Sequence, residues 1–121
     1  MLYTTYFAKL NSLPKCITPI AICGKSPDSY KGLQYKKLAP KWSFFSQWKE
    51  THDNYYYAKH YQAEVLNTLK PDEVYKELVE LAGGNTDIAL VCYEKPENFC
   101  HRSFVRNWFM VAGYDIKEYG C

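Results

Sequence analysis

The segment from Ile88 to Tyr119 constrains the fold of this chain more than any other part of the sequence. Its first part lies in TDIALVCYE, a continuous apolar run typical of strands buried on both faces of a parallel sheet. After a loop, CHRSFVRNWFMVAG places apolar residues at helical spacing, and Gly113 ends the predicted helix. The closing YDIKEYG predicts a short strand. This order predicts a parallel βαβ unit.

The residues before this unit predict two strands and three helices. LYTTYFAKL and CITPIAICG have strand compositions. Pro19 either weakens the second prediction or lies at the start of the strand or on an edge strand of the sheet. The helical patterns are KWSFFSQWKE, a segment after THDN with Tyr57, Tyr61, Val65, Leu66 and Leu69 on one face, and KPDEVYKELVELAGG with the stripe Val74, Leu78 and Leu81. The sequence therefore predicts a small layered α/β fold, with a short, mostly parallel sheet and helices packed on it.

Size and composition narrow the classes of protein. The 121 residues fit one domain spanning residues 1–121, and a net charge of +2 is far from that of a strong duplex-DNA binder. The five cysteines are irregularly spaced, and no secretory apolar segment precedes them, so we expect a reducing, cytoplasmic setting. No apolar stretch approaches the length of a membrane span, so we expect no membrane partner. The oligomeric state does not follow from the sequence.

Four chemically active residues, Cys100, His101, Arg102 and Ser103, stand together where the loop after the buried strand enters the last helix. Ligands of open α/β sheets gather at such junctions, and the free amides of a helix start favour an anion. Arg102 and Ser103 add a guanidinium and a hydroxyl that bind phosphate. We predict a phosphate site here. If it is catalytic, Cys100, His101 and Glu94 are the candidate nucleophile and acid–base groups.

Other residues extend this predicted site. Lys95 lies in the same loop, and Lys25 would reach the same edge if the second strand runs parallel to the one ending at Cys92. Tyr30 and Tyr61 offer ring faces on which a base stacks. The expected ligand is a phosphorylated small molecule, a nucleotide or nucleotide-like compound. No cofactor follows from the sequence.

Two alternatives stay open. The segment YKGLQYKK interleaves lysines with aromatic residues, which indicates a non-catalytic nucleic-acid or partner-binding module. A thiol redox protein would use Cys100, with Cys92 or Cys23 as the resolving residue. The spacing of Cys100 and Arg106 matches that of cysteine-dependent phosphatases, but the glycines of their phosphate loop are missing here. The cysteine and histidine spacing is unusual for zinc, so we expect no metal.

The motif VCYEKPENFCHRSFV resembles the signature of domain-of-unknown-function family 488. PIAICGKSPDSYKGLQYKKLAPKWSFF is similar to that family's Ile-rich strand, Pro-Tyr-Gly loop and Leu-Ala-Pro segment, and YYYAKHY to its tyrosine-rich helix. Where many relatives carry Arg-His-Pro after the first strand, this chain has NSLPKC. The resemblance covers most of the chain and implies a small α/β cytosolic protein of bacteria or phages. It implies no particular reaction.

Overall fold

The computed structural model describes residues 1–93 and 101–119. Its strands and α-helices are β1 (Leu2–Tyr6), β2 (Thr18–Ala21), β3 (Leu33–Gln34), α1 (Trp42–Thr51), α2 (Asn54–Glu64), α3 (Pro71–Leu81), β4 (Ile88–Cys92), α4 (Arg102–Val111) and β5 (Ile116–Glu118). Short 3-10 segments cover Phe7–Ser12, Lys36–Leu38 and Leu66–Thr68.

The strands form one five-stranded sheet in the order β3-β2-β4-β1-β5, and every described pairing is parallel. This confirms the predicted α/β class. β2 pairs with β4 along Thr18–Ala21 but with β3 only at Ile20 and Ala21. Pro19 therefore precedes the doubly paired part of the strand, where its missing N–H costs no ladder bond to β3.

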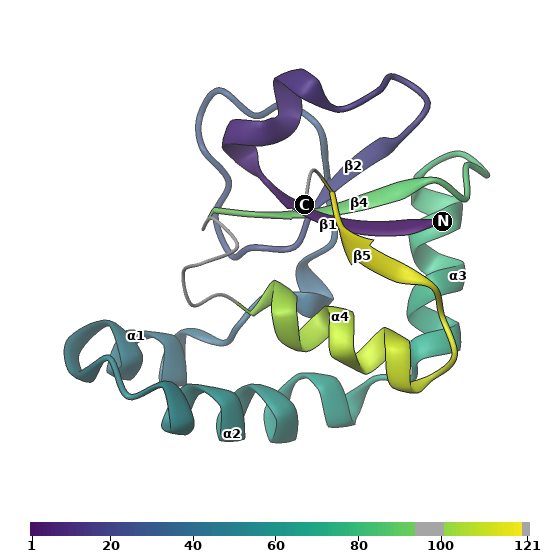
Figure 1. Cartoon of the computed structure of the whole chain (residues 1–121). Coiled ribbons are helices and arrows are strands. Elements are labelled where there is room, and N and C mark those ends of the chain that lie inside the picture. Colours follow the sequence, from purple (N-terminus) through teal and green to yellow (C-terminus); the bar gives the residue numbers. More distant parts are fainter. Residues whose placement is uncertain (94–100, 120–121) are drawn as a thin grey trace.

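The predicted βαβ unit is present as β4, α4 and β5. All five residues of β4 are buried, as its continuous apolar sequence indicated. The crossover through α4 passes β1, which lies between β4 and β5 in the sheet. In Figure 1, α1, α2 and α4 lie on one side of the sheet, and the 3-10 segment Phe7–Ser12 lies on the other.

Local signals set the helix ends. The side chain of Asp53 accepts a hydrogen bond from the Tyr56 amide and caps α2, so the capping role predicted for THDN is correct. α2 ends at Glu64, and Leu69 lies beyond it, after a 3-10 turn. α3 starts at Pro71 and is followed by Gly83 and Gly84, whose φ angles of 70° and 97° favour glycine.

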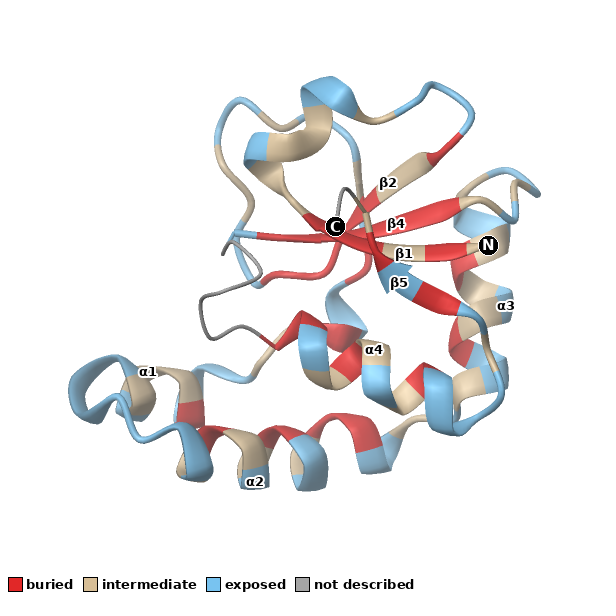
Figure 2. Cartoon of the chain, in the orientation of Figure 1, coloured by how far each residue is buried: buried red, intermediate tan, exposed pale blue. Residues whose placement is uncertain are grey.

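The core lies between the sheet and the inward faces of the helices (Figure 2). Val74 and Leu78 are buried as predicted, whereas Leu81 is 38% exposed, so the apolar stripe of α3 ends one turn early. Val105 and Phe109 bury the inner face of α4. None of the described helices is both long enough and apolar enough to cross a membrane.

Candidate functional site

The carboxyl ends of β2 and β4 lie side by side and form a switch point of the sheet. The connection that leaves β2 leads outward to β3, and the connection that leaves β4 leads the other way, past β1 to β5. In open α/β sheets, loops that diverge in this manner leave a crevice in which ligands bind. Gly24 and Lys25, which follow β2, share a cavity with Cys92 and Tyr93. β2 runs parallel to β4, which is the condition under which the sequence placed Lys25 at this edge.

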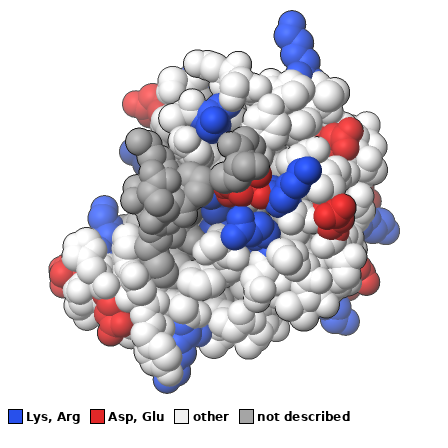
Figure 3. All heavy atoms as spheres, viewed as in Figure 1, with Lys and Arg blue, Asp and Glu red and all other residues white. Residues whose placement is uncertain are grey.

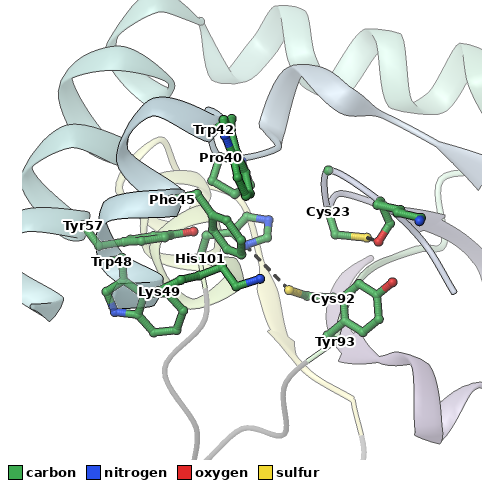
Figure 4. Close-up of a pocket in the computed structure, with 12 residues that line it drawn as sticks. Cys23, Pro40, Trp42, Phe45, Trp48, Lys49, Tyr57, Cys92, Tyr93 and His101 are labelled. Carbon is green, nitrogen blue, oxygen red and sulfur yellow. Dashed lines mark hydrogen bonds between the residues drawn. The ribbon is translucent and has the colours of Figure 1, made fainter. Parts of the chain in front are cut away.

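This cavity has a volume of about 700 Å³, within the usual range of small-ligand sites. Its described lining residues are Cys23, Gly24, Lys25, Pro40, Trp42, Phe45, Trp48, Lys49, Tyr57, Cys92, Tyr93 and His101. Figure 4 shows the aromatic side chains of α1 and α2 on one side and the sulfur atoms of Cys23 and Cys92 on the other. We call this space the β2/β4 cavity. It is a mainly aromatic hollow at the carboxyl edge of the sheet.

The aromatic wall is a chain of ring contacts on consecutive turns of α1. The ring centroids of Trp42 and Phe45 are 6.1 Å apart, and those of Phe45 and Trp48 are 5.9 Å apart. The Trp48 ring also meets Tyr57 of α2 edge-on, at 5.6 Å. Trp42 is 69% exposed, which is unusual for so large an apolar ring and leaves its face accessible at the mouth of the cavity.

His101 ties the two strand ends together from the start of α4. Its side chain is buried, with Nε2 2.8 Å from the Ile22 carbonyl oxygen and Nδ1 3.6 Å from Cys92 Sγ. Burial lowers the pKa of His101 from 6.5 to about 4, so the imidazole is neutral at physiological pH. A carbonyl oxygen only accepts, so Nε2 carries the proton and Nδ1 is the basic nitrogen.

Two lysines place positive charge in the β2/β4 cavity. Lys49 extends from α1 into the cavity, and its Nζ lies 5.7 Å from the centroid of the Phe45 ring. Lys25 lines the cavity from the loop after β2. Among residues 1–93 and 101–119, neither ammonium group has an ion-pair partner and no carboxylate lines the cavity. The described lining therefore has a net positive charge.

Arg102 lies on the other half of the sheet edge. Its guanidinium is 3% exposed, donates from Nε to Glu118 Oε1 at 3.1 Å, and covers the ring of Tyr6. Thr4 donates a hydrogen bond to the same carboxylate oxygen, and Arg106 lies 4.0 Å from it. Arg102 is therefore not among the residues that line the β2/β4 cavity, and its phosphate-binding role stays a prediction.

The other predicted residues fall in different places. Ser103 is exposed on α4. Tyr61 is fully buried, donates to the Leu38 carbonyl and meets the His101 ring edge-on at 5.5 Å. Tyr30 donates to the Leu33 carbonyl and packs against Phe7. Neither tyrosine lines the β2/β4 cavity. Tyr61 supports the site from behind His101.

Glu94, Lys95 and Cys100 lie outside the described residues, so their predicted roles stay predictions. Of the predicted site residues, the structure brings together His101 and Lys25 in one cavity.

Sequence reasoning missed Lys49, Trp42 and the other cavity residues of α1. The spacing of Trp42, Phe45 and Trp48 predicts a helix but not a cavity wall. Its signal was the exclusive use of aromatic rings where a core stripe normally contains aliphatic residues, with Lys49 one turn after Phe45.

The comparison with family models identifies a family for this chain. A family model described as the active DUF488-N3 subclade matches residues 11–113. The chain belongs to the DUF488 family. This matched range of the DUF488 protein contains both sides of the β2/β4 cavity, from Cys23 to His101. No curated protein and no solved structure matches it.

Proposed function

We propose that the β2/β4 cavity binds a phosphorylated, nucleotide-like small molecule. The observation that carries the proposal is the pairing of an aromatic wall with two lysines that have no described carboxylate partner, in one cavity at a switch point of the sheet. Aromatic faces bind a planar base by stacking, and ammonium groups bind phosphate. The setting we propose is the cytoplasm of a bacterium or of a phage-infected cell.

A chemical role for this site would use His101. In the neutral imidazole the backbone carbonyl of Ile22 fixes the proton on Nε2, so Nδ1, which lies 3.6 Å from Cys92 Sγ, is the basic nitrogen. The matching family is described as an active subclade, which supports a reaction by the protein without locating it. Cys100 and Glu94 stay as predicted partners of His101 in that reaction.

The nucleic-acid alternative has weaker support from the described residues. Tyr35 is buried and donates to Glu77, and Lys37 forms an ion pair with the same carboxylate. Tyr30 is turned toward the backbone of Leu33. On the face seen in Figure 3, basic side chains are scattered and do not form a band. The lysine–tyrosine loop therefore offers few exposed rings and little uncompensated charge to a nucleic acid.

One observation favours the thiol redox alternative. Cys92 is disulfide-bonded, and the free thiol Cys23 lines the same cavity. Burial raises the pKa of Cys23, however, so this residue is protonated at neutral pH and is a slow nucleophile. Thiol labelling at pH 7 tests this alternative, because a redox-active Cys23 would have to react as fast as an exposed cysteine such as Cys16.

A thermal-shift screen with inorganic phosphate and a set of nucleotides tests the proposed function. The proposal predicts that one or more nucleotides raise the melting temperature of the native protein. It also predicts that Lys25→Met abolishes most of this increase. Lys31→Met is the matched control, since Lys31 is an exposed lysine of the same loop outside the β2/β4 cavity. If no nucleotide raises the melting temperature, or if both variants respond alike, the proposed site is wrong.

A further inference from the structure

The charge of the β2/β4 cavity limits how many phosphates its ligand carries. The described lining contains two ammonium groups, those of Lys25 and Lys49, and no carboxylate. A phosphate monoester has a charge of about −1.5 to −2 at neutral pH. Two lysines balance one such group.

Each further phosphate would add at least one negative charge without a matching cation among the described lining residues. Apart from the two lysines, the described lining consists of aromatic side chains, two cysteines, Gly24, Pro40 and His101, with few groups that solvate an ion. An unpaired charge in such surroundings is unfavourable, because the protein returns little of the hydration that the charge loses. The cavity therefore matches a monophosphate better than a diphosphate or a triphosphate.

The distance between ring and cation also suits a single nucleotide unit. Lys49 lies one helical turn after Phe45, and its Nζ is 5.7 Å from the centroid of that ring. A base stacked on the Trp42–Phe45 side would lie close to this ammonium group, within reach of a phosphate on the attached sugar.

We infer that the ligand of the β2/β4 cavity is a nucleoside monophosphate, bound through its ring by the α1 aromatic residues and through its single phosphate by Lys25 and Lys49. This inference rests on the proposed function and narrows it to one substrate class. In this inference the aromatic residues bind the base and the two lysines bind the phosphate.

Isothermal titration calorimetry with the native protein tests the inference. The ligands are the four ribonucleoside 5′-monophosphates, their triphosphates, the free nucleosides and ribose 5-phosphate. We expect at least one monophosphate to bind about tenfold or more tightly than its triphosphate, its nucleoside and ribose 5-phosphate, since each comparison removes or overloads one contact. Lys49→Met should weaken binding of that monophosphate about tenfold, whereas Lys31→Met should leave it unchanged.

The failures of the two proposals differ in outcome. If a triphosphate binds as tightly as its monophosphate, the substrate class is wrong and the nucleotide site stands. Equal binding of ribose 5-phosphate and the monophosphates would overturn the role of the aromatic wall. If no compound of the set binds, the nucleotide site and its substrate class are both wrong.

Discussion

The two halves of the carboxyl edge of the sheet differ in whether their positively charged side chains are paired with a carboxylate. At the ends of β2 and β4, Lys25 and Lys49 line a cavity without an ion-pair partner among the described residues. At the ends of β1 and β5, Arg102 is buried against Glu118. His101 and Arg102 are consecutive, but the side chain of His101 lies in the cavity half and that of Arg102 in the ion-pair half. The comparison shows that the positive charge available to a ligand comes from the exposed lysines, while the arginine of the motif is compensated within the protein.

The ion-pair half has a role in stability. Arg102 and Glu118 are 3% and 6% exposed, and Glu118 Oε2 and Thr5 Oγ1 are buried without a hydrogen-bond partner in the described structure. A buried ion pair is not a large net gain, because both charges lose their hydration. Removing one partner strongly destabilises the fold, because the remaining charge stays buried without its counter-charge.

The largest expected effect follows from breaking this pair. Glu118→Leu should lower the free energy of unfolding by about 3–5 kcal/mol, because Arg102 stays buried and loses this carboxylate. Denaturant titration measures this loss. The double variant Glu118→Leu with Arg102→Met should recover much of it, because both charges are then absent. A loss below about 1 kcal/mol for the single variant would show that the pair does not stabilise the fold.

A somewhat smaller effect is expected for His101 as the pH falls. Its pKa is about 4 in the folded state and 6.5 without the protein environment, so below pH 6.5 the unfolded state takes up a proton that the folded state does not. The stabilisation is complete above pH 6.5, decreases toward pH 4 and then levels off. The total change is about 3 kcal/mol.

The control for this pH effect is His101→Asn. Carboxylates also titrate in this range, so the quantity to compare is the difference between the native protein and His101→Asn in denaturant titrations from pH 4 to pH 7. Our account predicts that this difference shrinks as the pH is lowered. A constant difference would mean that His101 titrates alike in the folded and unfolded states.

In the cavity half, the two lysines should affect binding and not stability. The double variant Lys25→Met, Lys49→Met should weaken binding of a nucleoside monophosphate about a hundredfold, because two charge-assisted contacts are lost. Both lysines are exposed, so the melting temperature without ligand should change little. Calorimetry together with thermal unfolding checks both expectations. A large loss of stability with unchanged affinity would reverse the roles of the two halves.

The smallest effect is expected from the rim of the aromatic wall. Trp42→Ala removes one stacking face and should weaken binding about tenfold, at the low end for a base-stacking ring since Trp42 is exposed on one side. Tyr55→Ala is the matched control, because Tyr55 is a similarly exposed ring that does not line the cavity. Equal affinities of the two variants, measured by titration calorimetry, would rule out a stacking role for Trp42.

The fold was largely predictable because its main elements carry strong local signals. The apolar run of β4, the helical spacing of α4 and the two glycines after α3 each specify one structure. The strand order was left open by the sequence, and the parallel pairing of β2 with β4 is what brings Lys25 and His101 together.

The division of the site was not predictable, because it depends on contacts between residues distant in sequence. No residue near Arg102 in the sequence indicates that its ion-pair partner is Glu118, which lies on β5. The exposure of Trp42 depends on how α1 rests beside the sheet edge. Local patterns indicate the secondary structure of such residues, but not the half of the sheet edge on which their charged side chains lie.

The most direct test of the central claim uses the indole N–H signals of the protein's three tryptophans in ¹⁵N-edited NMR spectra. Trp42 and Trp48 line the β2/β4 cavity, whereas Trp108 lies on α4 outside it. Titration with the tightest nucleoside monophosphate should shift the signals of Trp42 and Trp48 in a saturable manner and leave that of Trp108 in place. A saturable shift of Trp108 alone, or a shift of none of the three, would contradict a nucleotide site in this cavity.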